Sequence, residues 1–328
     1  MASLPRELLA MIFAEHANDS FTLHSCILVN RNWCVVALRY LWEKPFTLLL
    51  SRPRGKTSRS VDSLLTTFIE CFTDVDVLAS ASELHRKYCK EFPFDYSLYL
   101  KEIHPREIYS LSVQSSKYYH MRDRIILLAI AYCPNLSTLS LTLNSYLMGK
   151  SQPLVFINSI PNLQHLILYL NVENNMVNTL SVAAQNLKSI SVKVCKSAKY
   201  KYNLEQESHR GLQKLIQSQH QLKTITMANV ITRMETIFKL LESQSNSLES
   251  IILKHFRFYS DDSDTEQIKF YQLKRIYIKN CTILMGGLKS IFNADLPKLQ
   301  QLEFENTSWQ HTDDCTLLQG KYQIYSWK

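Results

Sequence analysis

A short pattern of apolar and polar positions recurs along most of the chain. It consists of an apolar residue, two variable residues, an apolar residue, one variable residue and a final apolar residue. The eight copies are IYSLSV (108–113), LSTLSL (136–141), LQHLIL (163–168), LKSISV (187–192), LKTITM (222–227), LESIIL (248–253), LKRIYI (273–278) and LQQLEF (299–304). Successive copies begin 24 to 35 residues apart, a spacing that indicates an architecture of repeated units.

Each repeated unit is predicted to contain one strand and one helix. The last apolar residues of each copy alternate with polar ones, which is the period of a β-strand. The segments between copies instead carry helical spacing, as in Leu212, Leu215 and Ile216, and again in Ile237, Phe238 and Leu241. One strand with one helix cannot enclose an apolar face alone, so the units are expected to stack into a continuous α/β core.

The ninth position of the repeat supports a family resemblance. It is filled by Asn144, Asn171, Cys195 and Cys281, with Ser116 and Thr307 as weaker substitutes. With this spacing, residues 105–310 resemble an irregular leucine-rich repeat protein of about eight repeats, which implies a solenoid with a curved parallel sheet and outer helices. Val230 and Phe256 depart from the pattern, so those repeats either turn differently or are read in the wrong register. The alternative is chance recurrence of Leu and Ile in an ordinary α/β protein.

The N-terminal segment has a separate, helical pattern. Residues 3–16 carry an apolar stripe of Leu4, Leu8, Leu9, Ile12 and Phe13, and Pro5 suits the first turn of a helix. The sequence NDS at 18–20 is expected to end this helix and cap the next, and residues 21–42 supply more helix. These pieces carry more apolar surface than about 45 residues enclose alone, so part of it must contact the rest of the chain or a partner.

The order of residues in this segment resembles the F-box. Its first half is matched by Leu4, Pro5, Glu7, Leu9, Ile12 and Phe13, and its second half by Leu23, Cys26, Val29, Arg31, Trp33, Leu41 and Trp42. The match covers about residues 3–46. The chain departs from the family at residues 15–18, where EHAN stands in place of a leucine that closes the first helix.

The F-box resemblance implies a fold and a partner. It implies a three-helix module that docks on a Skp-type adaptor of a cullin–RING ubiquitin ligase, while the repeats capture a protein substrate. The adaptor-facing set would be Leu4, Pro5, Leu9, Ile12, Val29 and Trp33, and the alternative for each is a core position. Leu41 and Trp42 are expected to hold the module on the segment that follows it.

These patterns divide the chain into four parts. They are an F-box-like module at 1–46, a loop and helical cap at 47–104, the repeats at 105–310 and a C-terminal cap or tail at 311–328. Residues 51–60 are polar and basic, which indicates an exposed loop. Residues 61–72 predict a helix with Leu64, Leu65, Phe68, Ile69 and Phe72 on one face.

Composition narrows the class of protein. The chain has 328 residues, is 46% hydrophobic and carries a net charge of +8 that is spread along its length. It shows no signal-peptide pattern and no apolar run long enough to span a bilayer, so an intracellular, cytoplasmic or nuclear protein without membrane association is expected. The 8 cysteines form no CxxC pair, and no nucleotide-binding, hydrolase or metalloprotease motif occurs. A non-catalytic protein without metal or cofactor is therefore expected.

The variable strand residues predict where a substrate would bind. In leucine-rich repeats these residues lie on the concave face, and here that face is expected to become basic and aromatic in the last three repeats. The proposed substrate-binding residues are Tyr169, Lys193, Lys254, Arg275, Tyr277 and Lys279. Lysine and arginine beside tyrosine suit a phosphate or an acidic peptide. The alternative is a solvated surface that binds nothing.

Three functions follow from the sequence. The first is a substrate-recognition subunit of a ubiquitin ligase, and the second is a protein-binding scaffold unconnected with ubiquitin. The third is a nucleic-acid binder that uses lysines and tyrosines of the insertion at 196–211, although an exposed loop is the favoured interpretation of that segment. The acidic stretch at 259–267 lacks the spacing of a calcium loop and is expected to form an exposed turn.

Overall fold

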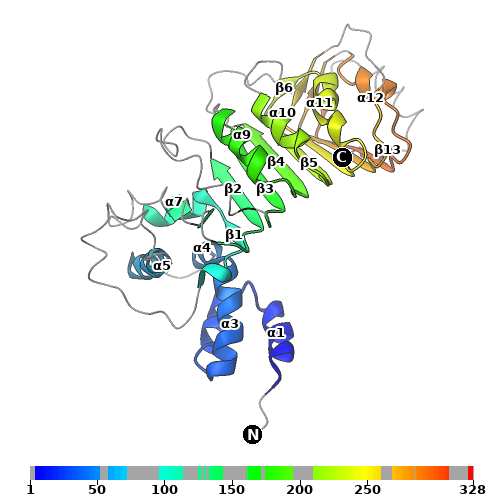
Figure 1. The fold of residues 1–328 in the computed structure, drawn as a ribbon. Helices are drawn as coiled ribbons and strands as arrows, with labels where there is room; N and C mark the ends of the chain where they lie inside the picture. The colour runs from blue at the N-terminus through cyan, green and yellow to red at the C-terminus, as the bar shows by residue number, and fades with distance from the viewer. Residues whose placement is uncertain are drawn as a thin grey trace. The chain divides into compact units, whose positions relative to one another are not determined.

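The chain folds as an α/β protein with a parallel sheet and contains two compact units (Figure 1). The first comprises Met1–Leu139 and Asn158–Asn162, and the second Ser140–Ile157 and Leu163–Lys328. The computed structural model describes residues 4–51, 58–71, 96–113, 125–126, 129–130, 133–142, 160, 162–170, 174–194, 210–259, 268–284, 286–309 and 324–327.

The first unit begins with three helices, α1 (Arg6–Glu15), α2 (Ser20–Cys26) and α3 (Arg31–Glu43). α1 runs in the same direction as α3, because Arg6 Nη2 donates to Asn32 Oδ1 near both helix starts (3.4 Å) and the Tyr40 hydroxyl donates to the Ala10 carbonyl further along (2.7 Å). Both α1 and α2 pack on α3. Their shared core consists of Leu9, Phe13, Leu23, Cys26, Val36 and Ala37.

Short polar side chains set the starts of α2 and α3. Asp19 Oδ1 accepts hydrogen bonds from the backbone N–H groups of Phe21 (3.0 Å) and Thr22 (3.1 Å), which confirms the cap predicted within residues 18–20. Hydrogen bonding from the Thr22 hydroxyl is the main cause that holds the pKa of Asp19 below its ordinary value. Asn30 caps α3 in the same way by accepting from the Trp33 N–H (3.0 Å).

Short elements continue the first unit beyond α3. They are α4 (Pro45–Leu50), α5 (Ser58–Glu70), the 3-10 turn η2 (Tyr96–Leu98), β1 (Glu102–Ile103) and α7 (Pro105–Ser112). The expectation of a loop over 51–60 is corrected at its end, since α5 begins at Ser58. Leu65 and Phe68 are buried on one face of α5 as predicted, and Phe68 packs edge-to-face on Phe46 of α4 (5.2 Å between ring centroids). Phe72 lies outside the described residues.

The first predicted strand, at 108–113, is wrong. This segment forms most of helix α7, and the strand is instead β1, which pairs in parallel with β2 (Thr138–Thr142) through Glu102↔Thr138. The pattern is ambiguous because apolar residues three apart also suit a helix, and Ile108 and Leu111 are both buried in this way. Pro105 at the first helical turn favours the helix.

The strands of the second unit form a parallel sheet. Along the sheet the order is β3 (His165–Leu170), β4 (Ser189–Val194), β5 (Thr224–Ala228), β7 (Ser250–Lys254), β9 (Arg275–Lys279), β11 (Gln301–Glu305) and β13 (Ile324–Trp327). Six of these strands, and β2 as well, begin at the third residue of a predicted copy. The structure therefore confirms the strand predicted in seven of the eight copies. β13 adds a strand beside β11 within the predicted C-terminal cap or tail.

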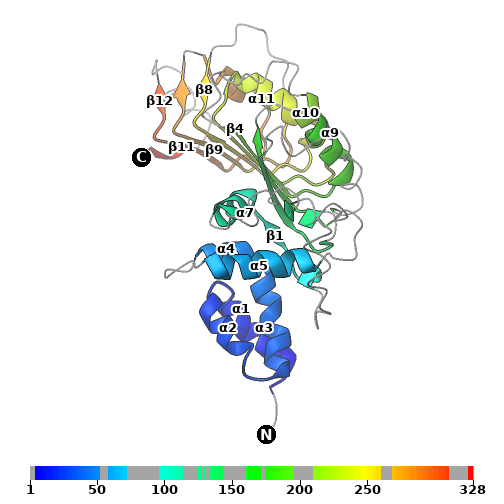
Figure 2. The same cartoon turned by 90° about the vertical axis from the view of Figure 1, so that its left-hand side faces the viewer.

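Helices cover one face of this sheet (Figures 1 and 2). They are α9 (Asn174–Ala183), α10 (Arg210–Gln217), α11 (Met234–Leu241), the 3-10 turn η6 (Glu242–Gln244) and α12 (Lys289–Asn293). The residues predicted for the helical faces of α10 and α11 are all buried, which confirms that part of the repeat. Alternate strand residues are buried beneath the helices, whereas their neighbours on each strand lie on the open face.

A left-handed residue follows four successive strands of the sheet. Asn229, His255, Asn280 and Asn306 have φ values of 63°, 57°, 51° and 50°. A short strand comes two residues later in each case, giving β6 (Ile231–Thr232), β8 (Arg257–Phe258), β10 (Thr282–Ile283) and β12 (Ser308–Trp309), which form a second parallel sheet. Asn and His tolerate this conformation better than most residues. The same steric requirement therefore recurs in four successive repeats.

The residue after each left-handed position lies at the predicted ninth position. Cys281 accepts a hydrogen bond from the Phe256 N–H (3.3 Å), and the Thr307 hydroxyl donates to the Ile278 carbonyl (3.4 Å). Burial raises the pKa of Cys281 to about 11, so its thiol stays protonated. Val230 and Phe256 are buried here too, and their repeats make the same turn, which corrects the expectation of a different turn or register. The other four predicted ninth positions lie outside the described residues.

Replacing Asn280 by Val is expected to lower the free energy of unfolding by about 1–2 kcal/mol. A β-branched residue is strained at positive φ, and the Asn280 N–H must keep donating to the Glu305 carbonyl (2.8 Å). Denaturant unfolding of the full chain measures this change. Asn280→Gly is the control and should cost a few tenths of a kcal/mol at most. Equal losses for Val and Gly would show that strain is not the cause.

Candidate functional site

Exposed apolar side chains are concentrated in the first helices. Of twelve large apolar residues exposed among the described residues, seven lie between positions 4 and 29. Six of these seven, which we name the N-terminal apolar surface, are Leu4, Leu8, Met11, Ile12, Leu28 and Val29. The seventh, Phe21, lies at the start of α2. Such a concentration is typical of an interaction surface, since single exposed apolar residues elsewhere are ordinary.

The spacing of residues in α1 explains why this surface exists. Leu8, Met11 and Ile12 recur at intervals of three and four, so they share one face of the helix. Leu9 and Phe13 form a second stripe that is buried against α2 and α3. α1 is therefore apolar on two faces, and only one of them is used by the core. Leu28 and Val29 lie in the turn between α2 and α3, next to the start of α3. The hydrogen bond between Arg6 and Asn32 places the start of α3 beside the start of α1.

The predicted adaptor-facing residues differ in their exposure in the structure. Leu4, Pro5, Ile12 and Val29 are exposed. Leu9 is completely buried, with 0% of its surface exposed, so its assignment to an adaptor-facing surface is corrected to a core position. Trp33 is half-buried, and its ring packs edge-to-face on Phe13 with 5.4 Å between centroids.

Three members of the N-terminal apolar surface were not among the predicted docking residues. Leu8 was recognised as part of the apolar stripe, but the family pattern does not use it. Met11 and Leu28 carry no motif signal, although Leu28 is 81% exposed. Helical periodicity could have identified Leu8 and Met11, because both lie on the same face as Ile12.

Trp42 connects α3 to later elements of the first unit. Its ring stacks on Tyr96 with 4.4 Å between centroids, which confirms that Trp42 contacts the segment predicted as a cap. Glu43 accepts a hydrogen bond from Lys101 Nζ at 2.5 Å, and the Lys101 N–H donates to the Glu43 carbonyl (2.9 Å). These contacts join the end of α3 to the residue before β1.

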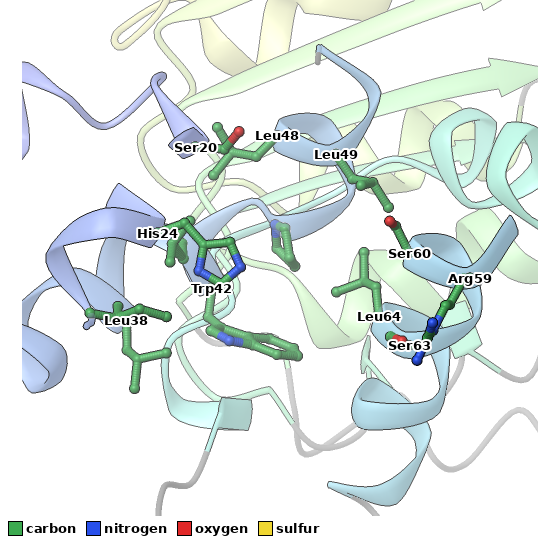
Figure 3. Close-up of a pocket in the computed structure, with 13 residues that line it drawn as sticks. Ser20, His24, Leu38, Trp42, Leu48, Leu49, Arg59, Ser60, Ser63 and Leu64 are labelled. Carbon is green, nitrogen blue, oxygen red and sulfur yellow. The ribbon is translucent and has the colours of Figure 1, made fainter. Parts of the chain in front are cut away.

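A cavity of about 450 Å³ opens beside Trp42. Figure 3 shows His24 and Trp42 on one side, with Leu64 and Ser60 of α5 on the other. Most of the residues that line the cavity are apolar, and its Ser, His and Arg side chains come from α2 and α5. The lining residues are Ser20, His24, Ile27, Leu38, Leu41, Trp42, Pro45, Leu48, Leu49, Arg59, Ser60, Ser63 and Leu64. The cavity contains no group of three His, Cys, Asp or Glu side chains suited to a metal, and none occurs elsewhere in the described part of the chain.

The open face of the second unit carries the predicted substrate-binding residues in aligned rows. Parallel pairing places six residues in register across neighbouring strands, which we name the carboxyl-end row: Tyr169, Lys193, Ala228, Lys254, Lys279 and Glu305. Tyr277 lies in the adjacent row, and Arg275 in the row beyond it. The structure thus brings all six predicted residues onto one face.

Several of these residues are already engaged with neighbours. Lys193 Nζ lies over the Tyr169 ring, 5.3 Å from its centroid. Lys279 Nζ forms a salt bridge with Glu305 Oε1 (2.5 Å), and the Tyr277 hydroxyl donates to Glu305 Oε2. Arg275 Nε donates to Gln301 Oε1 (2.5 Å).

Glu305 changes the electrostatics of the last strands. The hydrogen bond from Lys279 lowers the pKa of Glu305, and the same contact raises the pKa of Lys279. The hydrogen bond to Glu305 also raises the pKa of Tyr277. The Lys279 charge is therefore matched by a carboxylate at neutral pH. The expected basic character of the last three repeats is reduced at this end of the face.

Neither a protein-family model nor a curated protein matches the sequence. Within the described ranges, no helix combines the length and apolar character required to cross a membrane. The insertion at 196–211 is described only for Arg210 and Gly211, which begin α10, and the acidic stretch at 259–267 only for Tyr259.

Proposed function

We propose that this protein is the substrate-recognition subunit of an SCF-type cullin–RING ubiquitin ligase. In this proposal the N-terminal helices form an F-box that docks on a Skp-type adaptor. The observation that carries the proposal is the N-terminal apolar surface, which leaves Leu4, Ile12 and Val29 exposed at positions that the F-box pattern assigns to adaptor contact. An apolar surface of this kind is stabilised when a partner removes it from water.

The proposal also includes a leucine-rich repeat solenoid in the second unit. It is supported by the recurring order of strand, left-handed residue and short strand at β5, β7, β9 and β11, and by the helices α11 and α12 that follow β6 and β10. It is supported further by the stacking of these units through in-register parallel pairing. Such units bury their apolar faces only against their neighbours and leave an open strand face for a ligand.

The proposed function requires no chemistry from this chain. A subunit that holds an adaptor through one surface and a substrate through another raises the effective concentration of the substrate near the conjugating enzyme. The open strand face of the second unit would hold the substrate. The N-terminal apolar surface lies on the first unit, so separate substitutions can test the two roles.

Replacing Val29 by Asp is expected to weaken binding to a purified Skp-type adaptor by about tenfold or more. Val29 is 57% exposed, so the charge is tolerated in the isolated chain but is costly when a partner covers it. Val182→Asp on α9 is the matched control, because Val182 is 60% exposed and lies in the second unit. Biolayer interferometry with full-length chains measures both affinities.

The same experiment separates the two protein-binding functions. A protein-binding scaffold unconnected with ubiquitin would not bind the adaptor even as wild type. Adaptor binding that is unchanged in Val29→Asp, and also in a variant carrying both Leu4→Ala and Pro5→Ala, would overturn the assignment of this surface. Circular dichroism of each variant verifies that the helices remain folded.

A further inference from the structure

The residues that line the cavity beside Trp42 change in polarity with their exposure. Every exposed residue of the described lining is polar, and these residues are His24, Arg59 and Ser63. The buried lining residues are apolar apart from Ser20, and they are Leu38, Pro45, Leu48 and Leu49. The cavity therefore has apolar walls in its interior and polar groups where it meets the solvent. A ligand with an apolar body and one polar end matches this order.

The size and walls of the cavity suit an alkyl chain. Its volume of about 450 Å³ lies within the usual range of small-molecule sites and is about three times that of an apolar cavity that binds benzene. Six of its lining residues are Leu or Ile, and the indole ring of Trp42 is already stacked on Tyr96. All the lining residues belong to the first unit, so the cavity is formed within one compact unit.

The described lining carries a positive charge and no carboxylate. Arg59 is its one permanently charged side chain, and neither Asp nor Glu is part of it. Among the described residues Arg59 forms no salt bridge, whereas Arg39 pairs with Glu43 at 3.6 Å. Ser63 follows Arg59 by four residues, so both lie on the same face of α5. One guanidinium balances one negative charge, which favours a carboxylate over a phosphate with its charge of nearly −2.

We propose that this cavity binds a small alkyl carboxylate of the fatty-acid class, with its carboxylate at Arg59 and Ser63 and its chain among the leucines of α3 and α4. Burial of the chain removes apolar surface from water, and Arg59 supplies a charge-assisted hydrogen bond. His24 and Trp42 face α5 across the cavity (Figure 3), so a ligand between them would hold α5 against α2 and α3. The inference is independent of the proposed function, because the N-terminal apolar surface shares no residue with this lining.

Isothermal titration calorimetry of the full-length chain with decanoate tests this inference. The comparison ligands are 1-decanol, which has the same chain without the charge, and butyrate, which has the same carboxylate on a short chain. We expect decanoate to bind as one molecule per chain and about tenfold or more tighter than either comparison ligand. The loss of buried methylene groups weakens butyrate, and the loss of the charge-assisted hydrogen bond weakens 1-decanol.

Arg59→Gln should weaken decanoate binding by about tenfold and leave 1-decanol binding within about twofold. Arg31→Gln is the matched control, because Arg31 is an exposed arginine of the same unit that does not line the cavity. Its decanoate affinity should change less than about twofold, since distant charges are screened by salt. Ser63→Asp places a carboxylate one helical turn from Arg59 and should weaken decanoate as strongly as Arg59→Gln. Circular dichroism of each variant verifies that the helices remain folded.

Hydrogen exchange on the same samples locates the bound ligand. Decanoate should slow amide exchange in α2 and α5, which line the cavity, and leave α1 unchanged. Val29→Asp alters the N-terminal apolar surface outside the cavity, so it should leave decanoate affinity within about twofold.

Four results would overturn the inference. They are the absence of decanoate binding, binding of 1-decanol as tight as that of decanoate, equal effects of Arg59→Gln and Arg31→Gln, and protection of α1 in place of α2 and α5. Adaptor affinity, measured on the same variants, keeps the two proposals apart. Decanoate binding without adaptor binding contradicts only the ubiquitin-ligase function, and adaptor binding without decanoate binding contradicts only the inference.

Discussion

Replacing Leu9 by Ala is expected to lower the free energy of unfolding of the first helices by about 2–5 kcal/mol. The Leu9 side chain is fully buried in the core with Phe13 and Leu23, so its removal loses transfer free energy and leaves a cavity. Native-state hydrogen exchange measures the loss at α1–α3 specifically, which matters because a chain of two compact units need not unfold in one step.

Leu8→Ala is the matched control for this prediction. Leu8 is the neighbouring residue and is 47% exposed on the other apolar stripe of α1, so its truncation should cost less than about 1 kcal/mol. For adaptor binding by variants that remain folded, the order of the two effects should be reversed. Leu8→Ala should weaken binding more than Leu9→Ala, because Leu8 belongs to the exposed surface that is proposed to contact the adaptor. If Leu9→Ala left exchange rates in α1–α3 unchanged, the core position of Leu9 would be wrong.

Replacing Gln219 by Glu is expected to destabilise the second unit by about 3 kcal/mol near pH 7. Gln219 is 4% exposed, and its amide nitrogen donates to the Ala184 and Leu215 carbonyls, both at 2.8 Å. Its amide oxygen accepts from the Leu187 N–H (3.0 Å). In a carboxylate, the oxygen that replaces the amide nitrogen would face these two carbonyl oxygens in a buried environment, which disfavours the charged form.

The pH dependence of this variant has a definite sign. Burial and the facing carbonyls raise the pKa of the introduced Glu in the folded state above its value in the unfolded chain. Stability relative to wild type is therefore highest below the unfolded pKa and is lost as the pH rises above it. The deficit should grow by about 1.4 kcal/mol per pH unit between pH 5 and pH 7.

Gln217→Glu provides the control for the same charge change. Gln217 is exposed at the end of α10, so its substitution should change stability by less than about 0.5 kcal/mol at either pH. Denaturant unfolding of both variants at pH 5 and pH 7 gives the four values required. A pH-independent deficit in Gln219→Glu would show that water or structural rearrangement solvates the carboxylate.

Gln219 belongs to a buried amide ladder that the sequence did not reveal. Gln244 donates to the Gln219 carbonyl (2.9 Å) and to the Ile216 carbonyl (2.8 Å), so two successive repeats are joined by side-chain amides. Isolated glutamines in a sequence are ordinarily exposed. Only the packing of repeat on repeat places backbone carbonyls where these amides satisfy them.

The candidate site was predictable to different degrees on its two surfaces. The open strand face followed directly from strand alternation, because successive side chains must point to opposite faces. The pairing of Lys279 with Glu305 required the register between β9 and β11, since these residues are separated by a whole repeat. On α1, family resemblance grouped Leu9 with Ile12, whereas the packing against α3 divided them between core and surface.

The sequence alone determined the strands of seven repeats, the helical faces of α10 and α11, and the cap at Asp19. These features depend on periodicity and local hydrogen bonding, which a short segment contains within itself. The tertiary structure alone decided that residues 108–112 are helical, that Leu9 is buried beside an exposed Leu8, and that Lys279 pairs with Glu305 of the next repeat. Each of these depends on which distant residues become neighbours, and apolar spacing within one segment is compatible with more than one such arrangement.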